Sequence, residues 1–134
     1  MAEAASSNIF LVRHGSLITP PASENIPEGI TRASVMELAR QELRVEVIER
    51  PVDRSEIYVC DEIFFTRTMV EVAPVIRVDH RRVGTGEIGP VTAKLRHRYS
   101  LAAHGRLEAC RRWLMPVYEA PRVGPYPATH PLVI

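Results

Sequence analysis

The stretch Pro27-Glu28-Gly29-Ile30-Thr31-Arg32 decides how the rest of this chain is interpreted. Gly29 allows a tight turn, Thr31 is a good helix cap, and an amphipathic run follows at once to about Leu43. The apolar residues of that run recur at helical spacing, namely Val35, Leu38, Ala39 and Leu43. The pattern predicts a helix whose N-terminus offers free backbone N–H groups and a partial positive charge to a phosphate or carboxylate. Most such helix starts only begin a helix, so the pattern alone is weak evidence of an anion site.

The composition is that of one globular domain. The 134 residues contain 46% hydrophobic and 25% charged residues, which suits a single core rather than a disordered chain. The net charge of +1 disfavours broad electrostatic binding to nucleic acid or to an anionic membrane. No apolar run approaches the roughly 20 residues that span a bilayer, and residues 1–7 do not resemble a secretory signal. Cys60 and Cys110 are far apart, and we expect reduced thiols in a cytoplasmic protein.

Apolar runs bounded by turn residues predict a sheet rich in hairpins. The first hairpin turns at His14-Gly15, and Pro74 marks an edge or a bulge in a later strand. A capping-box pattern at residues 53–56 predicts a short helix to about Cys60. The expected strands are residues 8–13, 16–19, 44–50, 63–66 and 70–78, with a further hairpin arm at 80–83.

The last helix is expected to begin at Gly89-Pro90 and to stop at Gly105. Its predicted buried stripe comprises Val91, Leu95, Tyr99, Ala102 and Ala103. Trp113-Leu114 is expected to pack back on the body, and the proline-rich residues 118–134 are expected to be extended or disordered. The sequence therefore predicts a mixed α/β (α+β) domain over residues 1–117, with a hairpin-rich sheet and about three helices.

Three other patterns bear on possible chemistry. Residues 84–89 match GxGxxG, but Glu108, at about the spacing of a ribose-binding acid, follows a helix and not a strand, so we expect a hairpin loop. The five histidines lack the spacing of a zinc site. Asp61-Glu62 is expected to cap a helix or form a salt bridge more readily than to act as an acid or base.

Several segments, taken together, carry a family resemblance. They are Glu3, residues 8–10, 19–21, 29–32, 49–54, 61–66, 71–75 and 84–92. In this order and at nearly this spacing they resemble the class IV pyridoxal-phosphate aminotransferases, most of all the branched-chain amino acid aminotransferases. The resemblance spans about Ala2 to Val117 and implies the large C-terminal domain of that fold.

The resemblance also implies roles for individual residues. The cofactor phosphate would sit on the helix N-terminus, held by the backbone N–H groups of Ile30 and Thr31 and by the hydroxyls of Thr31 and Thr68. Glu3 would pair with the pyridine nitrogen of pyridoxal 5'-phosphate and keep the ring protonated, which makes it a better electron sink. The backbone around Thr68 and Met69 would receive the substrate carboxylate. No metal is implied.

Two departures from the family pattern bear on activity. The family's Schiff-base lysine precedes the glutamate matched by Glu3, so no residue of this chain matches it, and Lys94 lies in a different motif. Arg67 stands where the family usually has glycine, which is unfavourable if the backbone there needs a positive φ. The isolated chain is therefore expected to be inactive.

The resemblance implies transamination between leucine, isoleucine or valine and 2-oxoglutarate, by a full-length cytoplasmic homo-oligomer that acts on small molecules. Two alternatives remain open. One is a non-catalytic remnant or binding module, and the other is a relative that acts on D-amino acids or cleaves aminodeoxychorismate.

Overall fold

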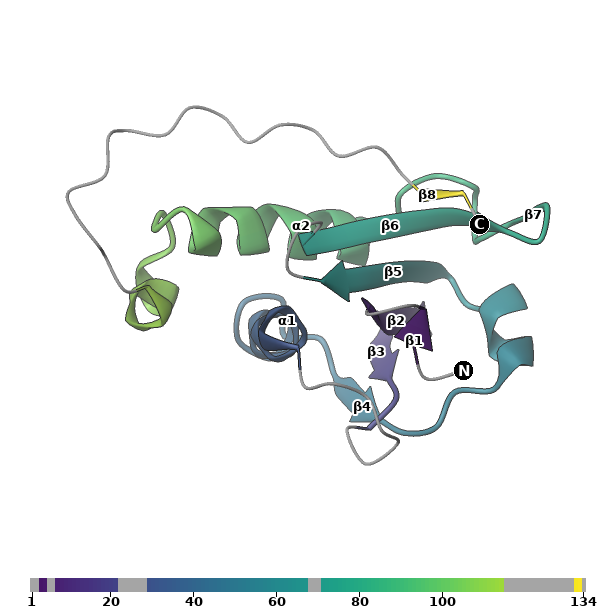
Figure 1. Ribbon diagram of the computed structural model, residues 1–134, viewed down its shortest axis with the longest axis horizontal. Coiled ribbons are helices and arrows are strands. Elements are labelled where there is room, and N and C mark those ends of the chain that lie inside the picture. The colour runs from purple at the N-terminus through teal and green to yellow at the C-terminus, as the bar shows by residue number, and fades with distance from the viewer. Residues whose placement is uncertain (1–2, 5–6, 22–28, 68–70, 115–131, 134) are drawn as a thin grey trace.

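A single sheet with helices on one face forms the body of the molecule (Figure 1). The computed structural model describes residues 3–4, 7–21, 29–67, 71–114 and 132–133, with only the backbone for residues 3–4. The elements are β1 (Glu3–Ala4), β2 (Ser7–Arg13), β3 (Ser16–Thr19), α1 (Ile30–Gln41), β4 (Val47–Glu49), the 3-10 helix η2 (Arg54–Tyr58), β5 (Glu62–Arg67), β6 (Glu71–Val78), β7 (Arg81–Arg82), α2 (Pro90–Ala103), the 3-10 helix η3 (Glu108–Trp113) and β8 (Leu132–Val133). The predicted mixed α/β class with a hairpin-rich sheet is confirmed.

The described strands follow the order β4-β3-β2-β5-β6-β7, with β1 beside β2 and β8 beside β6. Neighbours are antiparallel except for β3 with β4 and β6 with β8. The β2–β3 hairpin turns at His14 and Gly15, whose φ angles are 51° and 78°, as the His14-Gly15 pattern predicts. The chain then crosses through α1 and returns beside β3 as β4. This crossover places the start of α1 near the middle of the sheet.

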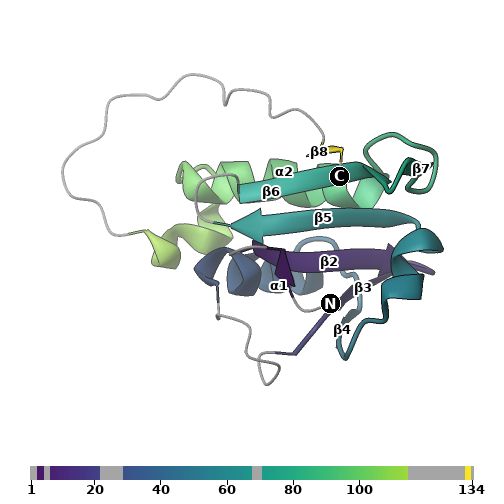
Figure 2. The same ribbon diagram turned by 45° about the vertical axis from the view of Figure 1, so that its right-hand side comes forward.

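The two faces of the sheet carry separate apolar clusters. One face packs against α1 and α2, which lie side by side behind the sheet in Figure 2. At its centre, Phe10 of β2 and Phe64 of β5 stack with ring centroids 4.9 Å apart. The other face packs against η2 and the segments beside it, with Val52, Ile57 and Cys60 buried there. Because residues alternate between faces along a strand, β2 and β5 are apolar nearly throughout.

The boundaries of α1 and β4 differ from the predictions. Gly29, with extended backbone angles, is the N-cap of α1, so the prediction that Thr31 caps the helix is wrong, and Thr31 lies in the first turn. The helix ends at Gln41 rather than Leu43, and the expected strand 44–50 shortens to β4. The reason is Arg44, whose φ of 52° makes a left-handed turn that no strand can contain.

Helix α2 begins and ends close to the predicted residues, with Gly89 as N-cap, Pro90 in the first turn and Gly105 at φ 71° just beyond. Of the expected stripe, Leu95 and Ala102 are buried, but Ala103 is exposed, so its prediction is wrong. Ala103 follows Ala102 by about 100° around the helix and so points outward.

Three further expectations concern η2, Pro74 and the C-terminal region. The capping pattern at residues 53–56 is confirmed, because the Glu56 carboxylate accepts the Asp53 N–H at 3.1 Å, although the helix is a 3-10 helix. Pro74 pairs with Phe64 and has no strand partner on its other side among the described residues, as expected of an edge. Trp113 is half-buried against the cluster beneath the helices, as expected, and Leu114 is 39% exposed. Of the proline-rich segment, Leu132–Val133 pairs with β6, and the boundary at residue 117 stays a prediction.

Candidate functional site

The first turn of α1 lies directly against the start of β2. A Cβ atom at Gly29 would come within 2.6 Å of the side-chain oxygen of Asn8, which is closer than a real Cβ contact allows. The φ of Gly29 is −69°, so this position needs glycine for the close approach and not for its backbone angles. Asn8 is 7% exposed, and its side chain therefore forms a buried polar wall beside the helix start.

The helix start offers backbone donors. The helical hydrogen bonds begin with the N–H of Ala33, which donates to the Gly29 carbonyl at 3.0 Å. The N–H groups of Ile30, Thr31 and Arg32 precede this bond, and none of the residues that the structure describes accepts from them. Ile30 is 86% exposed, whereas Thr31 is 5% exposed, so the turn has an open side and a closed side. Free donors and the positive end of the helix dipole together suit an anion.

Asn8 also links the helix start to the strands that carry the other predicted site residues. Its Cα pairs with Glu3 of β1 on one side and with Thr66 of β5 on the other. The backbone of Glu3 is thus one strand away from the residue that Gly29 contacts. The predicted Thr68 and Met69 lie outside the described residues, and β5 ends at Arg67, immediately before Thr68.

Thr66 carries an unusual buried hydroxyl. The residue is 1% exposed, and its Oγ1 has no hydrogen-bond partner among the described residues. A buried hydroxyl without a partner is costly, so such an atom points to a missing acceptor or donor. Neither Thr66 nor the side chain of Asn8 is among the site residues predicted from the sequence. The available signal was a polar residue at the end of an otherwise apolar strand, next to the glycine-threonine turn in the same resemblance.

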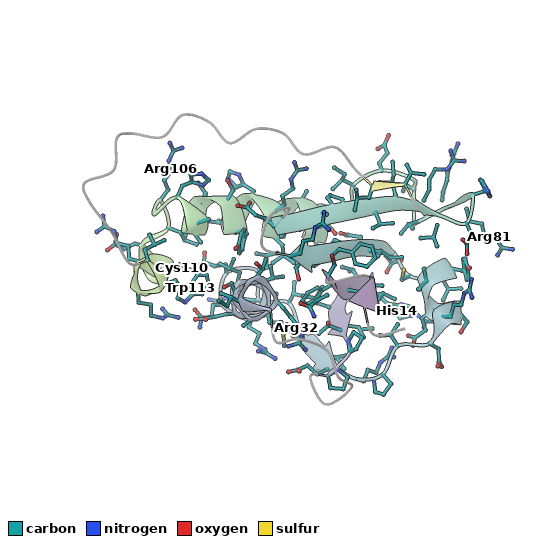
Figure 3. All side chains as sticks on the ribbon, viewed as in Figure 1. His14, Arg32, Arg81, Arg106, Cys110 and Trp113 are labelled. Atoms are coloured by element: carbon teal, nitrogen blue, oxygen red, sulfur yellow. The ribbon has the colours of Figure 1, made fainter. Side chains whose placement is uncertain are left out.

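Arg32 anchors the helix start to the sheet (Figure 3). Its side chain is 7% exposed, and its Nη2 donates to the Pro20 carbonyl and to the Glu49 carboxylate, each at 3.0 Å. Arg32 therefore places a guanidinium in the first turn of α1, partly neutralised by Glu49, and ties α1 to β3 and β4. This cation adds to the positive potential at the helix start.

Arg67 does not adopt the backbone conformation that the family's glycine suggested. It continues β5, and it is not among the described residues with positive φ. The left-handed conformation occurs instead at Glu71, its cross-strand partner, with a φ of 58°. No described residue forms an ion pair with Arg67, and its side chain is exposed. The cation therefore lies at the strand end that adjoins the predicted substrate turn.

The two acidic and glycine-rich patterns have structural roles. Glu62 is 6% exposed, and its carboxylate accepts hydrogen bonds from the first turn of α2, which bears out the expected capping role. The glycine-rich residues 84–89 form the loop between β7 and α2, where Gly84 and Gly86 have φ angles of 53° and 82°. A two-residue strand before this loop is not the head of a dinucleotide-binding unit.

Comparisons with known proteins point to one family. The family described as amino-transferase class IV matches residues 1–78. A probable branched-chain-amino-acid aminotransferase of Aquifex aeolicus is 48% identical over 119 residues, which cover 89% of this chain and 38% of that protein. The branched-chain-amino-acid aminotransferase of Pseudomonas aeruginosa is 38% identical over 113 residues, covering 84% of this chain and 36% of that protein. The chain thus spans well under half the length of these relatives.

Solved structures agree with these sequence matches. A branched-chain amino acid aminotransferase from Thermobaculum terrenum, in its PLP form, superposes with a TM-score of 0.81 at 43% identity, covering 84% of this chain and 37% of that one. A second such enzyme, of the T.th. strain, is complexed with N-(5'-phosphopyridoxyl)-L-glutamate and superposes with a TM-score of 0.83 at 40% identity. That alignment covers 87% of this chain and 39% of the other.

Proposed function

This chain belongs to the class IV aminotransferase family, and we propose that it forms the cofactor-binding part of a branched-chain amino acid aminotransferase. Class IV aminotransferases are pyridoxal-phosphate enzymes, and solved relatives carry the cofactor in its pyridoxal or pyridoxamine form. The observation that carries the proposal is the buried, unpartnered Thr66 hydroxyl, one strand from the residue that packs against the open N-terminus of α1.

The residues at the helix start fit a phosphate group. Three N–H groups without a described acceptor, the Thr31 side chain and the buried Arg32 guanidinium supply donors and positive charge. In the proposal, the N–H groups of Ile30 and Thr31 and the hydroxyls of Thr31 and Thr68 hold the phosphate. Asn8 excludes water from one side of the turn.

The cofactor, when bound, supplies an electron sink for bond changes at the α-carbon of the amino acid. In the proposal, the Glu3 carboxylate faces the pyridine nitrogen and retains its proton, and the backbone at Thr68 and Met69 orients the substrate carboxylate. Glu3 lies on a strand paired with Asn8, which supports this placement. We assign the cofactor-attaching lysine to a part of the longer protein that the relatives' length implies.

The proposed reaction transfers an amino group between leucine, isoleucine or valine and 2-oxoglutarate, within a cytoplasmic homo-oligomer. The names of the sequence relatives support this substrate class. Two solved complexes of the T.th. enzyme contain a phosphopyridoxyl-glutamate in one case and 4-methylvaleric acid in the other. These two ligands are related to glutamate and to a branched aliphatic side chain.

One observation favours a second candidate. Arg67 places an exposed guanidinium next to the turn proposed to receive the substrate carboxylate. A bulky cation there is compatible with a non-catalytic remnant that binds the cofactor phosphate without performing transamination. Activity of the longer protein that contains this chain separates the two, and leucine, D-alanine and aminodeoxychorismate as substrates separate the aminotransferase from its relatives.

Binding of pyridoxamine 5'-phosphate to this chain tests the site itself. Isothermal titration should detect pyridoxamine 5'-phosphate, and pyridoxamine, which lacks the phosphate, should bind at least about tenfold more weakly. Thr31→Val should weaken the phosphorylated ligand by several fold, whereas Thr85→Val, in the exposed loop before α2, should not. Equal affinity for the two ligands would exclude a phosphate site at the start of α1.

A further inference from the structure

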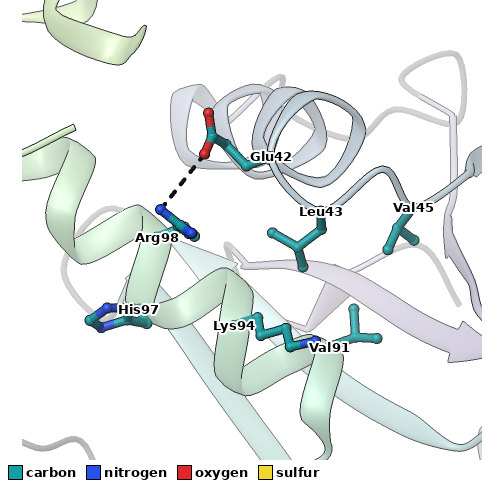
Figure 4. Close-up of a pocket in the computed structure, with 7 residues that line it drawn as sticks. All are labelled: Glu42, Leu43, Val45, Val91, Lys94, His97 and Arg98. Atoms are coloured by element: carbon teal, nitrogen blue, oxygen red, sulfur yellow. Dashed lines mark ion pairs between the residues drawn. The ribbon is translucent and has the colours of Figure 1, made fainter. Parts of the chain in front are cut away.

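A second hollow lies at the opposite end of α1 from the proposed phosphate site. It has a volume of about 380 Å³ and is lined by Glu42, Leu43, Val45, Val91, Lys94, His97 and Arg98 (Figure 4). Helix α1 has 12 residues, so at about 1.5 Å per residue its two ends are about 18 Å apart. The hollow is therefore distinct from the proposed cofactor site, and its volume falls in the range of about 300–1,000 Å³ typical of small-molecule sites.

The floor of the hollow is apolar. Leu43 and Val45 follow the end of α1, Val91 belongs to the first turn of α2, and all three are half-buried. They pack against the same apolar cluster as Phe10 and Leu95. Water over such a floor has few partners, so a hydrocarbon group that displaced it would be stabilised.

The rim of the hollow is cationic on the α2 side. Lys94, His97 and Arg98 follow one another at spacings that place them on one helix face. Arg98 lies 3.7 Å from Glu42, so its charge is largely balanced. Among the residues that the structure describes, Lys94 has no ion-pair partner, and in Figure 4 its side chain extends beside Val91 over the floor.

Lys94 is not needed to cap α1. The carbonyl of Leu38 accepts the N–H groups of Glu42 and Leu43 at 2.9 and 3.3 Å, and the carbonyl of Ala39 accepts that of Val45 at 2.9 Å. The chain itself thus satisfies carbonyls in the last turn of α1. The ammonium of Lys94 is left over an apolar floor, and no described residue is a structural partner that explains it.

We propose that this hollow binds a small branched aliphatic carboxylate, with the carboxylate on Lys94 and the hydrocarbon on Leu43, Val45 and Val91. An inorganic phosphate fits the arrangement less well, because half of the lining offers it no donor. An aliphatic carboxylate matches both halves, since its charge pairs with the ammonium and its tail covers apolar surface.

The composition provides a direct probe of the site. Lys94 is the only lysine among the 134 residues, so reductive ¹³C-methylation, which keeps the charge, labels Lys94 and the terminal amine alone. Titration of the labelled chain with 4-methylvalerate should shift the Lys94 methyl signal in a saturable way. The neutral 4-methylvaleramide should bind about tenfold more weakly, because the ion pair is lost. Dodecanoate separates a lipid-sized ligand from a short one, and we expect it to bind no more tightly than 4-methylvalerate.

Matched variants test the residues. Lys94→Gln should weaken binding about tenfold, as measured by backbone amide shifts at Leu43, Val45 and Val91. Arg96→Gln removes a positive charge from the same helix without touching the lining, and it should leave the affinity unchanged within about twofold. The proposal is overturned if Lys94 does not respond, if the amide binds equally well, or if both variants weaken binding alike. It is also overturned if the shifts fall only at residues 29–31, or if the Lys94 signal follows protein concentration instead of ligand, which would indicate contact between copies.

Discussion

The carboxylate of Glu62 closes the first turn of α2 by accepting two hydrogen bonds from Thr92. Its Oε2 accepts the Thr92 N–H at 2.7 Å and the Thr92 hydroxyl at 2.6 Å, and its Oε1 accepts the Val91 N–H at 3.0 Å. The N-cap residue of α2 is Gly89, which has no side chain to do this. A carboxylate from β5 therefore does what a capping side chain normally does, and it pins α2 to the sheet.

Loss of this carboxylate should destabilise the fold strongly. Glu62→Gln should lower the free energy of unfolding by about 2–4 kcal/mol, because an amide group cannot satisfy three donors around a buried helix start. Urea denaturation measures the change. The control is Glu46→Gln, which removes an exposed carboxylate bonded to the Ser16 hydroxyl and should cost less than about 1 kcal/mol. Equal effects of the two changes would show that the Glu62 cap contributes little.

Two glycines should respond differently to alanine. A Cβ at Gly89 would lie 2.1 Å from the Glu62 side chain, although the φ of Gly89 is an ordinary −73°, so Gly89→Ala should displace the cap and cost about 2 kcal/mol or more. Gly15→Ala meets no atom within 4 Å but sits at φ 78°, and should cost only about 1 kcal/mol of backbone strain. Thermal or urea unfolding of the pair gives the order. A larger loss for Gly15→Ala would contradict the close approach at Gly89.

The stability of the chain should depend on Glu56 in acid. The Arg50 guanidinium donates two hydrogen bonds to this carboxylate, at 2.8 and 2.6 Å, and lowers the pKa of Glu56 from 4.5 to about 2. A lowered folded-state pKa means that the stabilisation is complete above pH 4.5 and is lost as the pH falls towards 2. Glu56→Gln should therefore be less stable than the parent by about 1–2 kcal/mol at pH 7, a modest value because Arg50 is partly exposed.

The same variant should approach the parent at low pH. Unfolding free energies at several pH values between about 7 and 3 measure the convergence. A difference that stays constant across this range would mean that the Glu56 carboxylate does not titrate as the Arg50 contact implies.

The unpartnered hydroxyl of Thr66 should matter for binding and not for folding. Thr66→Val replaces it with a methyl group of similar size, which should leave the free energy of unfolding unchanged or raise it by up to about 1 kcal/mol. The affinity for pyridoxamine 5'-phosphate should fall by several fold. Urea denaturation and isothermal titration measure the two effects. Destabilisation by more than about 1 kcal/mol, with unchanged affinity, would give the hydroxyl a structural role instead.

Much of the local structure follows from short-range patterns. The hairpin at His14-Gly15, the start of α2 at Pro90 and the capping arrangement at Asp53 and Glu56 depend on residues within a few positions of one another, and they were predicted. The cap of α1 was predicted wrongly, because a threonine in a helix start is a good cap only where its backbone is extended. Gly29 has that conformation, and Asn8 leaves no room there for a side chain.

The sequence by itself determined the family, the mixed α/β class and the stretch at which an anion would bind, because spacing and periodicity are properties of the chain alone. Only the tertiary structure showed that Asn8 joins Glu3, Gly29 and Thr66, that Glu62 caps α2, and that Lys94 lies over an apolar floor. These relationships link residues that are far apart in the chain. They depend on strand register and on how closely two backbones approach, and local propensity specifies neither.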